Sequence, residues 1–182
     1  MLTSAWLTID KYYYNAIKFA SGAFGSIHHG CEKDNPNKRV VVKIVGNDQD
    51  ARLKEAKCQK KLKGHKNIVS LLTYTFVDGD DDLGEKLTLV LEYCNGGNLK
   101  DFLRKKGGFL RQKIITEYLL PQLRAGYKAM YDQNIVHRDI KLENIFLSHR
   151  ETDFPDPDEI IFKVRPCLFR TKLTIKFACE FY

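Results

Sequence analysis

The chain has 182 residues, of which 43% are hydrophobic and 29% are charged, and its formal net charge is +7. This length allows one full domain or part of a larger one, and the composition is ordinary for a soluble protein with a packed core. The 30 basic residues are interspersed with 23 acidic ones, so we expect solvated surface charge and no nucleic-acid partner.

The cysteines indicate the cellular environment. There are five, without a Cys-x-x-Cys pair, which is typical of reduced thiols in a cytoplasmic or nuclear protein. The segment from Met1 to Trp6 has no basic region followed by a long apolar run, so we expect no secretory signal. No apolar stretch reaches the roughly 18 residues that a membrane span needs, and we expect none.

The first half of the chain is predicted to be mainly strands. The β-branched run Val40-Val41-Val42 favours a buried strand, whereas residues 50–63 are rich in Lys, Glu, Ala and Leu and favour a helix. The acidic segment 78–85 lacks the EF-hand spacing, which favours a solvated hairpin turn over a calcium site. We predict strands over residues 12–20, 26–29, 39–45, 68–76 and 87–93, and one helix over residues 50–63.

The second half changes to helical periodicity after Gly96-Gly97. A short helix is predicted from Leu99, and apolar residues recur at helical spacing over residues 112–132, where Pro121 should kink the helix or divide it in two. Residues 145–147 and 160–164 are predicted to pair as strands. This order of elements indicates an α+β fold of two lobes, with residues 94–98 as the hinge.

Residues 137–146 carry the most informative motif, His-Arg-Asp-Ile-Lys-Leu-Glu-Asn-Ile-Phe. It places the carboxylate of Asp139, the ammonium of Lys141 and the carboxamide of Asn144 on one loop ahead of an apolar strand. Phosphoryl transfer needs an acceptor for the substrate proton, a cation for the migrating phosphate and a neutral oxygen ligand for a metal. The alternative, a basic turn between a helix and a strand, explains less of so long a motif.

Three further motifs precede this string. Residues 20–27 (Ala-Ser-Gly-Ala-Phe-Gly-Ser-Ile) are a Gly-rich hairpin turn, Lys43 ends a strand, and Glu55 lies on the next predicted helix, placed to pair with Lys43. Each motif is weak evidence alone. In this order and spacing the four motifs resemble the eukaryotic protein kinase family over roughly residues 12–164.

The resemblance implies a bilobal kinase fold. It would have a complete N-lobe, consisting of an antiparallel five-stranded sheet and one helix, and only the start of the helical C-lobe. We divide the chain into an N-terminal extension (1–10), the N-lobe (11–94), a partial C-lobe with the catalytic loop (95–164) and a basic tail outside the family pattern (165–182).

The reaction implied by the resemblance is the transfer of the γ-phosphate of ATP to Ser or Thr hydroxyls, with ATP and Mg²⁺ as cofactors and an unidentified protein substrate. Asp139 would accept the substrate proton, Lys141 would steady the γ-phosphate and Asn144 would bind magnesium. Arg138 would dock a phosphorylated activation loop. Lys141 is typical of Ser/Thr kinases, and residues 118–147 are similar to regulatory kinases that initiate autophagy.

Residues of both lobes would enclose ATP. The backbone from Gly22 to Gly25 would cover the phosphates, and Lys43, held by Glu55, would contact the α- and β-phosphates. Leu91 would be the gatekeeper behind the adenine, which would bond to the backbone of Glu92 and Cys94. The implied ATP-binding residues are Ala20, Gly22, Gly25, Ile27, Val41, Lys43, Glu55, Leu91, Glu92, Cys94 and Phe146.

Four positions depart mildly from the family pattern. Ala20 replaces the first glycine of the turn. Val41 stands where the family usually has Ala, and Phe146 where it has a smaller aliphatic residue, so the adenine slot should be narrower. Gln59 replaces an apolar residue, and a buried amide there needs partners or costs ~1–3 kcal/mol.

The largest departure follows the predicted strand 160–164. The family has one residue and then Asp-Phe-Gly, whose Asp chelates magnesium, whereas here Arg165 is followed by Pro166-Cys167-Leu168. The segment Asp153-Phe154-Pro155 precedes that strand and is not expected to replace the motif. Without this Asp and the remaining C-lobe, we expect the chain itself to have little or no kinase activity.

The tail has the alternating pattern of an amphipathic strand over residues 173–181. An altered reading frame, a retained intron or an alternative splice form is our hypothesis for its departure from the family. Two alternative interpretations stay open. In the first, the chain is a non-catalytic module that binds a nucleotide or a partner. In the second, it is an unstable fragment in which the apolar face of helix 112–132 is exposed.

Overall fold

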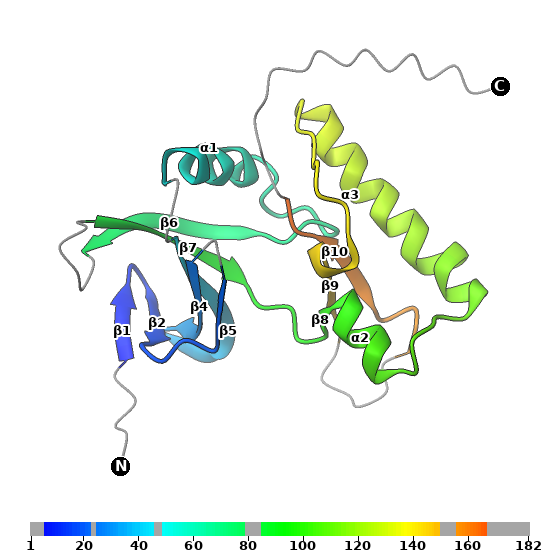
Figure 1. Cartoon of the computed structure of the whole chain (residues 1–182), viewed down its shortest axis with the longest axis horizontal. Coiled ribbons are helices and arrows are strands. Elements are labelled where there is room, and N and C mark those ends of the chain that lie inside the picture. The colour runs from blue at the N-terminus through cyan, green and yellow to red at the C-terminus, as the bar shows by residue number, and fades with distance from the viewer. Residues whose placement is uncertain (1–5, 23–24, 46–48, 79–84, 150–155, 167–182) are drawn as a thin grey trace.

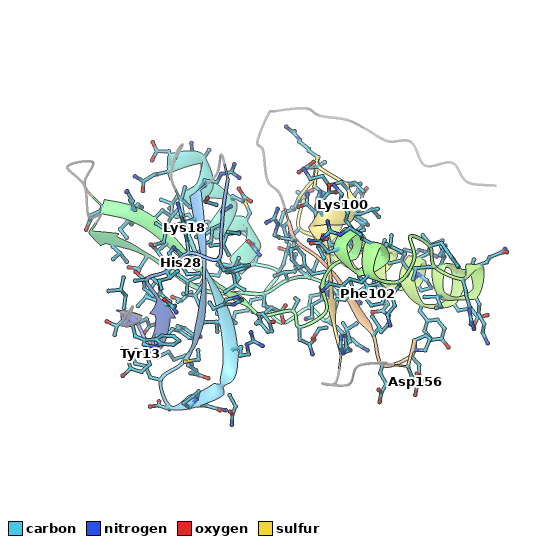
Figure 2. The ribbon with its side chains drawn as sticks, turned by 60° about the horizontal axis from the view of Figure 1, so that its bottom comes forward. Tyr13, Lys18, His28, Lys100, Phe102 and Asp156 are labelled. Carbon is cyan, nitrogen blue, oxygen red and sulfur yellow. The ribbon has the colours of Figure 1, made fainter. Side chains whose placement is uncertain are left out.

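The computed structural model describes residues 6–22, 25–45, 49–78, 85–149 and 156–166. These residues form two bodies, one around a large sheet and the other around the helices α2 (Leu99–Lys105) and α3 (Leu120–Asp132) (Figure 1, Figure 2). This arrangement confirms the predicted fold of two lobes. The predictions for the tip of the Gly-rich turn, the acidic turn, Asp153-Phe154-Pro155 and the tail from residue 167 lie outside the described residues.

The large sheet has the strand order β1-β2-β4-β5-β7-β6, with β3 paired to β4. All of these pairs are antiparallel. Alternation along β5 turns Val40 and Val42 into a core with Val90, which explains why the β-branched run forms a strand. The strands are β1 (Trp6–Ile9), β2 (Tyr12–Asn15), β3 (Ala20–Gly22), β4 (Gly25–Glu32), β5 (Asn35–Ile44), β6 (Leu71–Asp78) and β7 (Glu85–Glu92).

The sequence predicts five strands here, whereas the described residues form seven. The predicted strand over residues 12–20 is divided, because the side-chain oxygen of Asn15 accepts a hydrogen bond from the N–H of Ile17 at 2.8 Å and forms a local turn. The other additional strand is β1, which pairs with β2 and lies in the predicted N-terminal extension. Of its four residues only Ile9 is buried, so β1 carries little of the alternation that marks a strand in a sequence.

Helix α1 (Gln49–Lys60) confirms the helix predicted over residues 50–63. It lies along β6 and β7 (Figure 1). Gln59 is only 4% exposed, and its Nε2 donates a hydrogen bond to the carbonyl of Val69 at 2.9 Å. The buried amide therefore has a partner, and the penalty for an unsatisfied polar group does not arise.

Pro121 lies in the first turn of α3, where the helix predicted over residues 112–132 changes type and continues. The π-helix η1 (Ile114–Leu119) precedes α3, and the N–H of Leu120 donates to the carbonyl of Ile115. Because proline has no N–H, the α-helical pattern of hydrogen bonds is interrupted at this point. Strands β8 (Gly97–Asn98), β9 (Ile145–Ser148) and β10 (Ile161–Val164) form a second antiparallel sheet, which confirms the predicted pairing of residues 145–147 with 160–164.

Apolar side chains fill both bodies and the region between them. One cluster combines Leu62 after α1, Ile68 before β6, Met130 of α3 and Val164 of β10. This cluster therefore packs the helical body against the segments that follow α1 and precede β6. No helix in the described part of the chain is long and apolar enough to cross a membrane.

Strand β10 is bound to the segment before β6. The N–H of Val69 donates to the carbonyl of Val164 at 2.9 Å, and the N–H of Val164 donates to the carbonyl of Asn67 at 2.9 Å. These bonds explain why β6 begins at Leu71, although the sequence predicts a strand from Ile68. The backbone of residues 67–69 pairs with β10 in place of β7.

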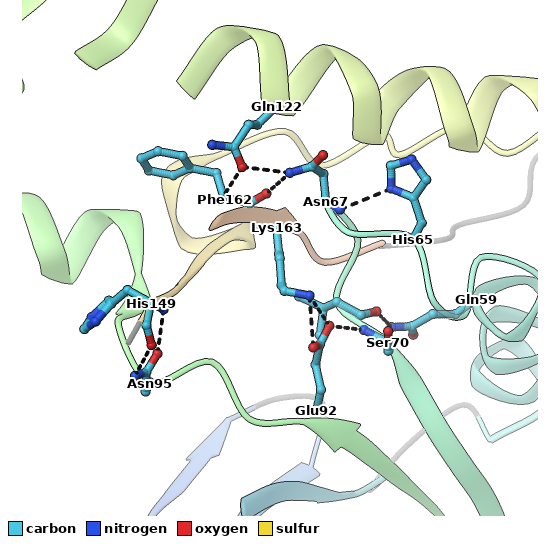
Figure 3. A network of polar contacts seen from close by, with 11 residues as sticks. Gln59, His65, Asn67, Ser70, Glu92, Asn95, Gln122, His149, Phe162 and Lys163 are labelled. Carbon is cyan, nitrogen blue, oxygen red and sulfur yellow. Dashed lines mark hydrogen bonds and ion pairs between the residues drawn. The ribbon is translucent and has the colours of Figure 1, made fainter. Parts of the chain in front are cut away.

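Gln122 of α3 strengthens this junction. Its Oε1 accepts hydrogen bonds from Nδ2 of Asn67 at 2.8 Å and from the N–H of Phe162 at 3.0 Å (Figure 3). Its Nε2 donates to the carbonyl of Ile160 at 3.0 Å. One side chain thus ties α3 to β10 and to the segment before β6.

An ion pair joins the end of β7 to β10. The Nζ of Lys163 lies 3.0 Å from each carboxylate oxygen of Glu92, and Glu92 also accepts a hydrogen bond from the N–H of Ser70 at 2.6 Å (Figure 3). Lys163 is 8% exposed. A shielded pair whose carboxylate has a further hydrogen bond fixes the geometry of the groups that it connects.

We expect Gln122→Ala to lower the free energy of unfolding by about 2–3 kcal/mol, because the N–H of Phe162 and the carbonyl of Ile160 lose their partner in a partly buried place. Gln112→Ala makes the same chemical change at an exposed position before η1 and should alter stability by less than about 0.5 kcal/mol. Urea denaturation of both variants measures the difference. Equal effects would contradict a structural role for Gln122.

Candidate functional site

A cavity of about 370 Å³ lies between the large sheet and the helical body. Strands β4, β5 and β7 line it from the large sheet, and β9 lines it from the other body. The cavity therefore collects residues that are far apart in the sequence. The predicted ATP-binding residues that line it are Ile27, Val41, Lys43, Leu91, Glu92, Cys94 and Phe146.

The inner part of the cavity is apolar. Val41 and Leu91 are paired in register on β5 and β7, so their side chains lie side by side on one face of the sheet. Phe146 of β9 lines the cavity from the other body. The volume lies within the range of ~300–1,000 Å³ found for ligand pockets, and the narrowing of the slot by Val41 and Phe146 stays a prediction.

The hinge contributes a buried thiol. Burial, and to a smaller extent the nearby carboxylate of Glu92, raise the pKa of Cys94 to about 12. The thiol is therefore neutral at physiological pH and behaves as a small apolar group. The carbonyl of Cys94 accepts a hydrogen bond from Gly97 at 3.1 Å. A Cβ at Gly96 would lie 2.7 Å from that of Leu147, so only glycine fits the next position of this turn.

Three aromatic side chains that sequence reasoning missed also line the cavity. The rings of Phe19 and His29 are stacked with centroids 4.0 Å apart, and Tyr93 meets His29 edge-on at 6.2 Å. Burial and the nearby Arg39 lower the pKa of His29, which favours the neutral imidazole. The signal for His29 was available, because it lies two residues after Ile27 on one strand and therefore on the same face.

The Gly-rich turn is a hairpin of β3 and β4. Ala20 pairs with Ile27, and Gly22 pairs with Gly25. Gly25 has a φ of 119°, which favours glycine because a Cβ would be strained there. Ile27 in turn pairs with Lys43 of β5, so the hairpin returns beside the lysine predicted to contact phosphates.

Glu55 does not lie in the cavity lining. Its Oε2 accepts a hydrogen bond from Nη1 of Arg52, three residues earlier on α1, at 2.6 Å. Their side chains are 12% and 10% exposed. In the described part of the chain Glu55 forms an ion pair with Arg52, and its pairing with Lys43 stays a prediction. The i,i+3 spacing on one helix places the guanidinium beside the carboxylate, and a role of Glu55 in ATP binding stays a prediction.

Asp139, one of the two predicted catalytic residues, contacts the other, Lys141, and also the predicted metal ligand Asn144. Oδ2 of Asp139 lies 2.9 Å from Nζ of Lys141 and accepts a hydrogen bond from Nδ2 of Asn144 at 2.9 Å. Nδ2 of Asn144 also donates to the carbonyl of Asp139 at 2.8 Å. The hydrogen bond from Lys141, helped by that from Asn144, holds the pKa of Asp139 below its usual range. Asp139 is therefore a carboxylate at neutral pH, as a proton acceptor must be.

The buried His137 connects the catalytic loop to the segment that follows β10. It is 4% exposed, its Nε2 lies 2.9 Å from the carbonyl of Arg165, and its Nδ1 accepts from the N–H of Asp139 at 3.2 Å. These two contacts require a neutral ring with the proton on Nε2. Burial lowers the pKa of His137, in agreement with that tautomer. Arg138, between them, has a φ of 62°, a conformation that the contacts on either side must hold.

Arg165 is the unexpected member of the site. Its Nη2 donates to Oδ1 of Asn144 at 2.6 Å, its N–H donates to the carbonyl of Asn144 at 2.8 Å, and its guanidinium carbon lies 5.8 Å from the ring centre of Phe146. Asn144 is 1% exposed, so both ends of its buried amide have partners, Asp139 at the nitrogen and Arg165 at the oxygen. Arg165 also lines the cavity.

These residues do not fit a magnesium ion. The oxygen of Asn144 that would ligate the metal accepts a hydrogen bond from a cation, and Pro166, at the position of the family's Asp, has no side-chain oxygen. Magnesium requires oxygen ligands, and a guanidinium beside the ligand repels it. Over the described ranges no group of three or more His, Cys, Asp and Glu residues is arranged to hold a metal.

The family assignment follows from comparison with known proteins. The protein kinase domain family matches residues 13–158, which include the Gly-rich hairpin, Lys43 and the catalytic loop. The chain belongs to the protein kinase family. This agrees with the resemblance that the four motifs carry.

The kinase chain has relatives of the serine/threonine type. It is 31% identical over 135 residues to the probable serine/threonine-protein kinase zyg-1 of Caenorhabditis briggsae, covering 74% of this chain and 18% of the relative. It is 32% identical over 148 residues to the serine/threonine-protein kinase ULK1 of Homo sapiens, covering 79% of this chain and 13% of the relative. The kinase chain thus spans less than a fifth of either protein.

A solved structure confirms the kinase fold. A chain in the structure of the CAK complex from Chaetomium thermophilum bound to ATP-gamma-S superposes with a TM-score of 0.66 at 23% sequence identity. The match covers 86% of this chain and 46% of that chain. The fold of this kinase chain therefore corresponds to part of a larger kinase structure.

We expect Cys94 to resist alkylation by iodoacetamide in the folded protein at pH 8. The reactive species is the thiolate, and a thiol with a pKa of about 12 forms almost none of it at that pH. Cys31 and Cys58 are half-buried and should be modified earlier. Mass spectrometry of peptides from a time course measures the order, and modification of Cys94 before these two would show that the hinge is open.

Proposed function

We propose that this chain binds adenine nucleotides in the cavity and is strongly impaired in the reaction of its family, the transfer of the γ-phosphate of ATP to Ser or Thr hydroxyls. The hydrogen bond from Arg165 to Asn144 carries this proposal, because it places a cation where the family's reaction uses a metal. Nucleotide binding is supported by the convergence of the hinge, Lys43 and Ile27 of the Gly-rich hairpin on one cavity, whose lining among the described residues does not include Ala20, Gly22 or Gly25. The protein substrate and a cytoplasmic or nuclear location stay predictions.

The groups that handle the proton and the phosphate are retained. The contacts of Lys141 and Asn144 both fall on Oδ2 of Asp139, so Oδ1 is the oxygen that can accept the proton of a substrate hydroxyl. Lys141 lies beside this carboxylate, where its ammonium can meet a transferred phosphate. The loop has thus kept its base and its cation.

The stabilisation of phosphate charge is what the chain lacks. Removing one preorganised electrostatic contact from a transition state commonly costs about 10²–10³ in rate. Here both metal-binding positions of the family are affected, since Asn144 is bonded to Arg165 and Pro166 stands in place of the family's Asp. A guanidinium can neutralise charge on ATP, but it cannot bridge the phosphates as a metal ion does.

We expect no more incorporation of radiolabelled γ-phosphate into a generic Ser/Thr substrate or into the chain itself than is seen with Lys43→Met. The assay uses the whole purified chain with ATP and excess Mg²⁺, and an active serine/threonine kinase confirms that the substrate and the detection work. Turnover that Lys43→Met abolishes would refute the proposed impairment. It would leave nucleotide binding intact as a conclusion.

A further inference from the structure

We infer that Arg165 is a phosphate-binding residue that takes the place of the metal, so that this chain binds ATP in its metal-free form. The inference rests on the proposed binding of nucleotide in the same cavity. It adds the chemical form of the ligand and the residue that selects it. The hydrogen bond between Arg165 and Asn144, which would prevent a metal-dependent reaction, would then hold Arg165 in place to bind phosphate.

The backbone of Arg165 is held at the wall of the cavity. It directly follows β10, its N–H donates to the carbonyl of Asn144 at 2.8 Å, and its carbonyl lies 2.9 Å from Nε2 of the buried His137. The side chain is oriented by Oδ1 of Asn144 at 2.6 Å and by the ring of Phe146. A side chain that is already ordered loses little conformational entropy when a ligand binds.

The chemistry of the guanidinium suits this role. It has five N–H donors in a planar fork, so a contact of Nη2 with Asn144 is compatible with further contacts to phosphate oxygens. Arginine is also charged at every physiological pH, and its fork matches the geometry of phosphate. The site therefore offers a permanent cation where a metal-dependent kinase has a metal.

The neighbouring charges favour a highly anionic ligand. The cavity lining contains three cations, Lys43, Lys105 and Arg165, and two carboxylates, Glu92 and Asp101, each of which is paired with a cation. Glu92 is paired with Lys163 at 3.0 Å, and Asp101 accepts from Nδ2 of Asn98 at 2.8 Å and lies 3.2 Å from Arg104.

Metal-free ATP carries more negative charge than its magnesium complex, so it interacts more favourably with the cations of the cavity lining. A magnesium ion carried into the cavity would also face the guanidinium of Arg165 at the oxygen of Asn144. Both effects predict that magnesium weakens the binding of ATP to this chain. A site built around a metal shows the opposite dependence.

Isothermal titration of the whole chain with ATP, in EDTA and in excess Mg²⁺ at equal ionic strength, tests the inference. We expect binding in EDTA and an affinity at least about tenfold lower in Mg²⁺. Arg165→Met should lower the affinity for metal-free ATP by about tenfold or more, the size of a charge-assisted hydrogen bond. It should leave the affinity for adenosine, which has no phosphate, unchanged.

Two further variants make this test specific. Arg124→Met removes the same side chain from an exposed position on α3, outside the cavity, and should not change the affinity for ATP. Arg165→Lys keeps the charge and should retain part of the affinity that Arg165→Met loses. Circular dichroism confirms that each variant is folded, and Arg165→Lys carries the comparison if Arg165→Met is not.

The outcomes separate the inference from the proposed function. ATP binding that requires Mg²⁺ would overturn the inference, and so would an Arg165→Met variant that melts at a lower temperature but binds metal-free ATP as tightly as before. Equal affinity for adenosine and ATP in EDTA would also overturn it, while the nucleoside slot would stand. Failure of both ligands to bind in either buffer would overturn the proposed nucleotide binding as well.

Discussion

Strand β10 is the element on which the rest of this structure depends. Two backbone hydrogen bonds join Val164 to the segment before β6, and the shielded ion pair of Lys163 with Glu92 joins the same strand to the end of β7. Gln122 connects α3 to this junction through three hydrogen bonds. Because the large sheet and the helical body meet through β10, the position of this strand sets the walls of the cavity between them.

The residue that follows this strand, Arg165, is the one on which the proposed function depends. Arg165 directly follows Val164, and its backbone is held by Asn144 and by His137 at the catalytic loop. In the kinase family a carboxylate follows one position later and turns this region into a metal site. Here the junction presents a guanidinium to the carboxamide of Asn144, so one supporting geometry is combined with the opposite charge.

In this chain the contacts within the catalytic loop are therefore independent of whether a metal can bind beside it. Asp139 contacts Lys141 and Asn144, as the proposed roles of a base and a cation on one loop require. These contacts need only local backbone geometry, which the buried His137 maintains. Metal binding needs oxygen ligands from two segments, and one of those segments supplies arginine and proline. The loop can thus keep its internal hydrogen bonds while the positive charge of the neighbouring Arg165 favours an anion over a metal ion.

The sequence by itself determined the family, most of the strands and helices and the position of Pro121 in the long helix, and the family resemblance implied that the hinge, Ile27 and Lys43 meet. These features follow from local periodicity and from motifs whose spacing is constrained by chemistry. Only the tertiary structure decided that Glu55 pairs with Arg52, that Phe19, His29 and Tyr93 line the cavity, and that Arg165 bonds to Asn144. The contacts at the cavity depend on where side chains from different elements meet. The pair of Glu55 with Arg52 depends on how two side chains of one helix are packed. Such choices are settled by packing and burial, which a linear pattern does not record.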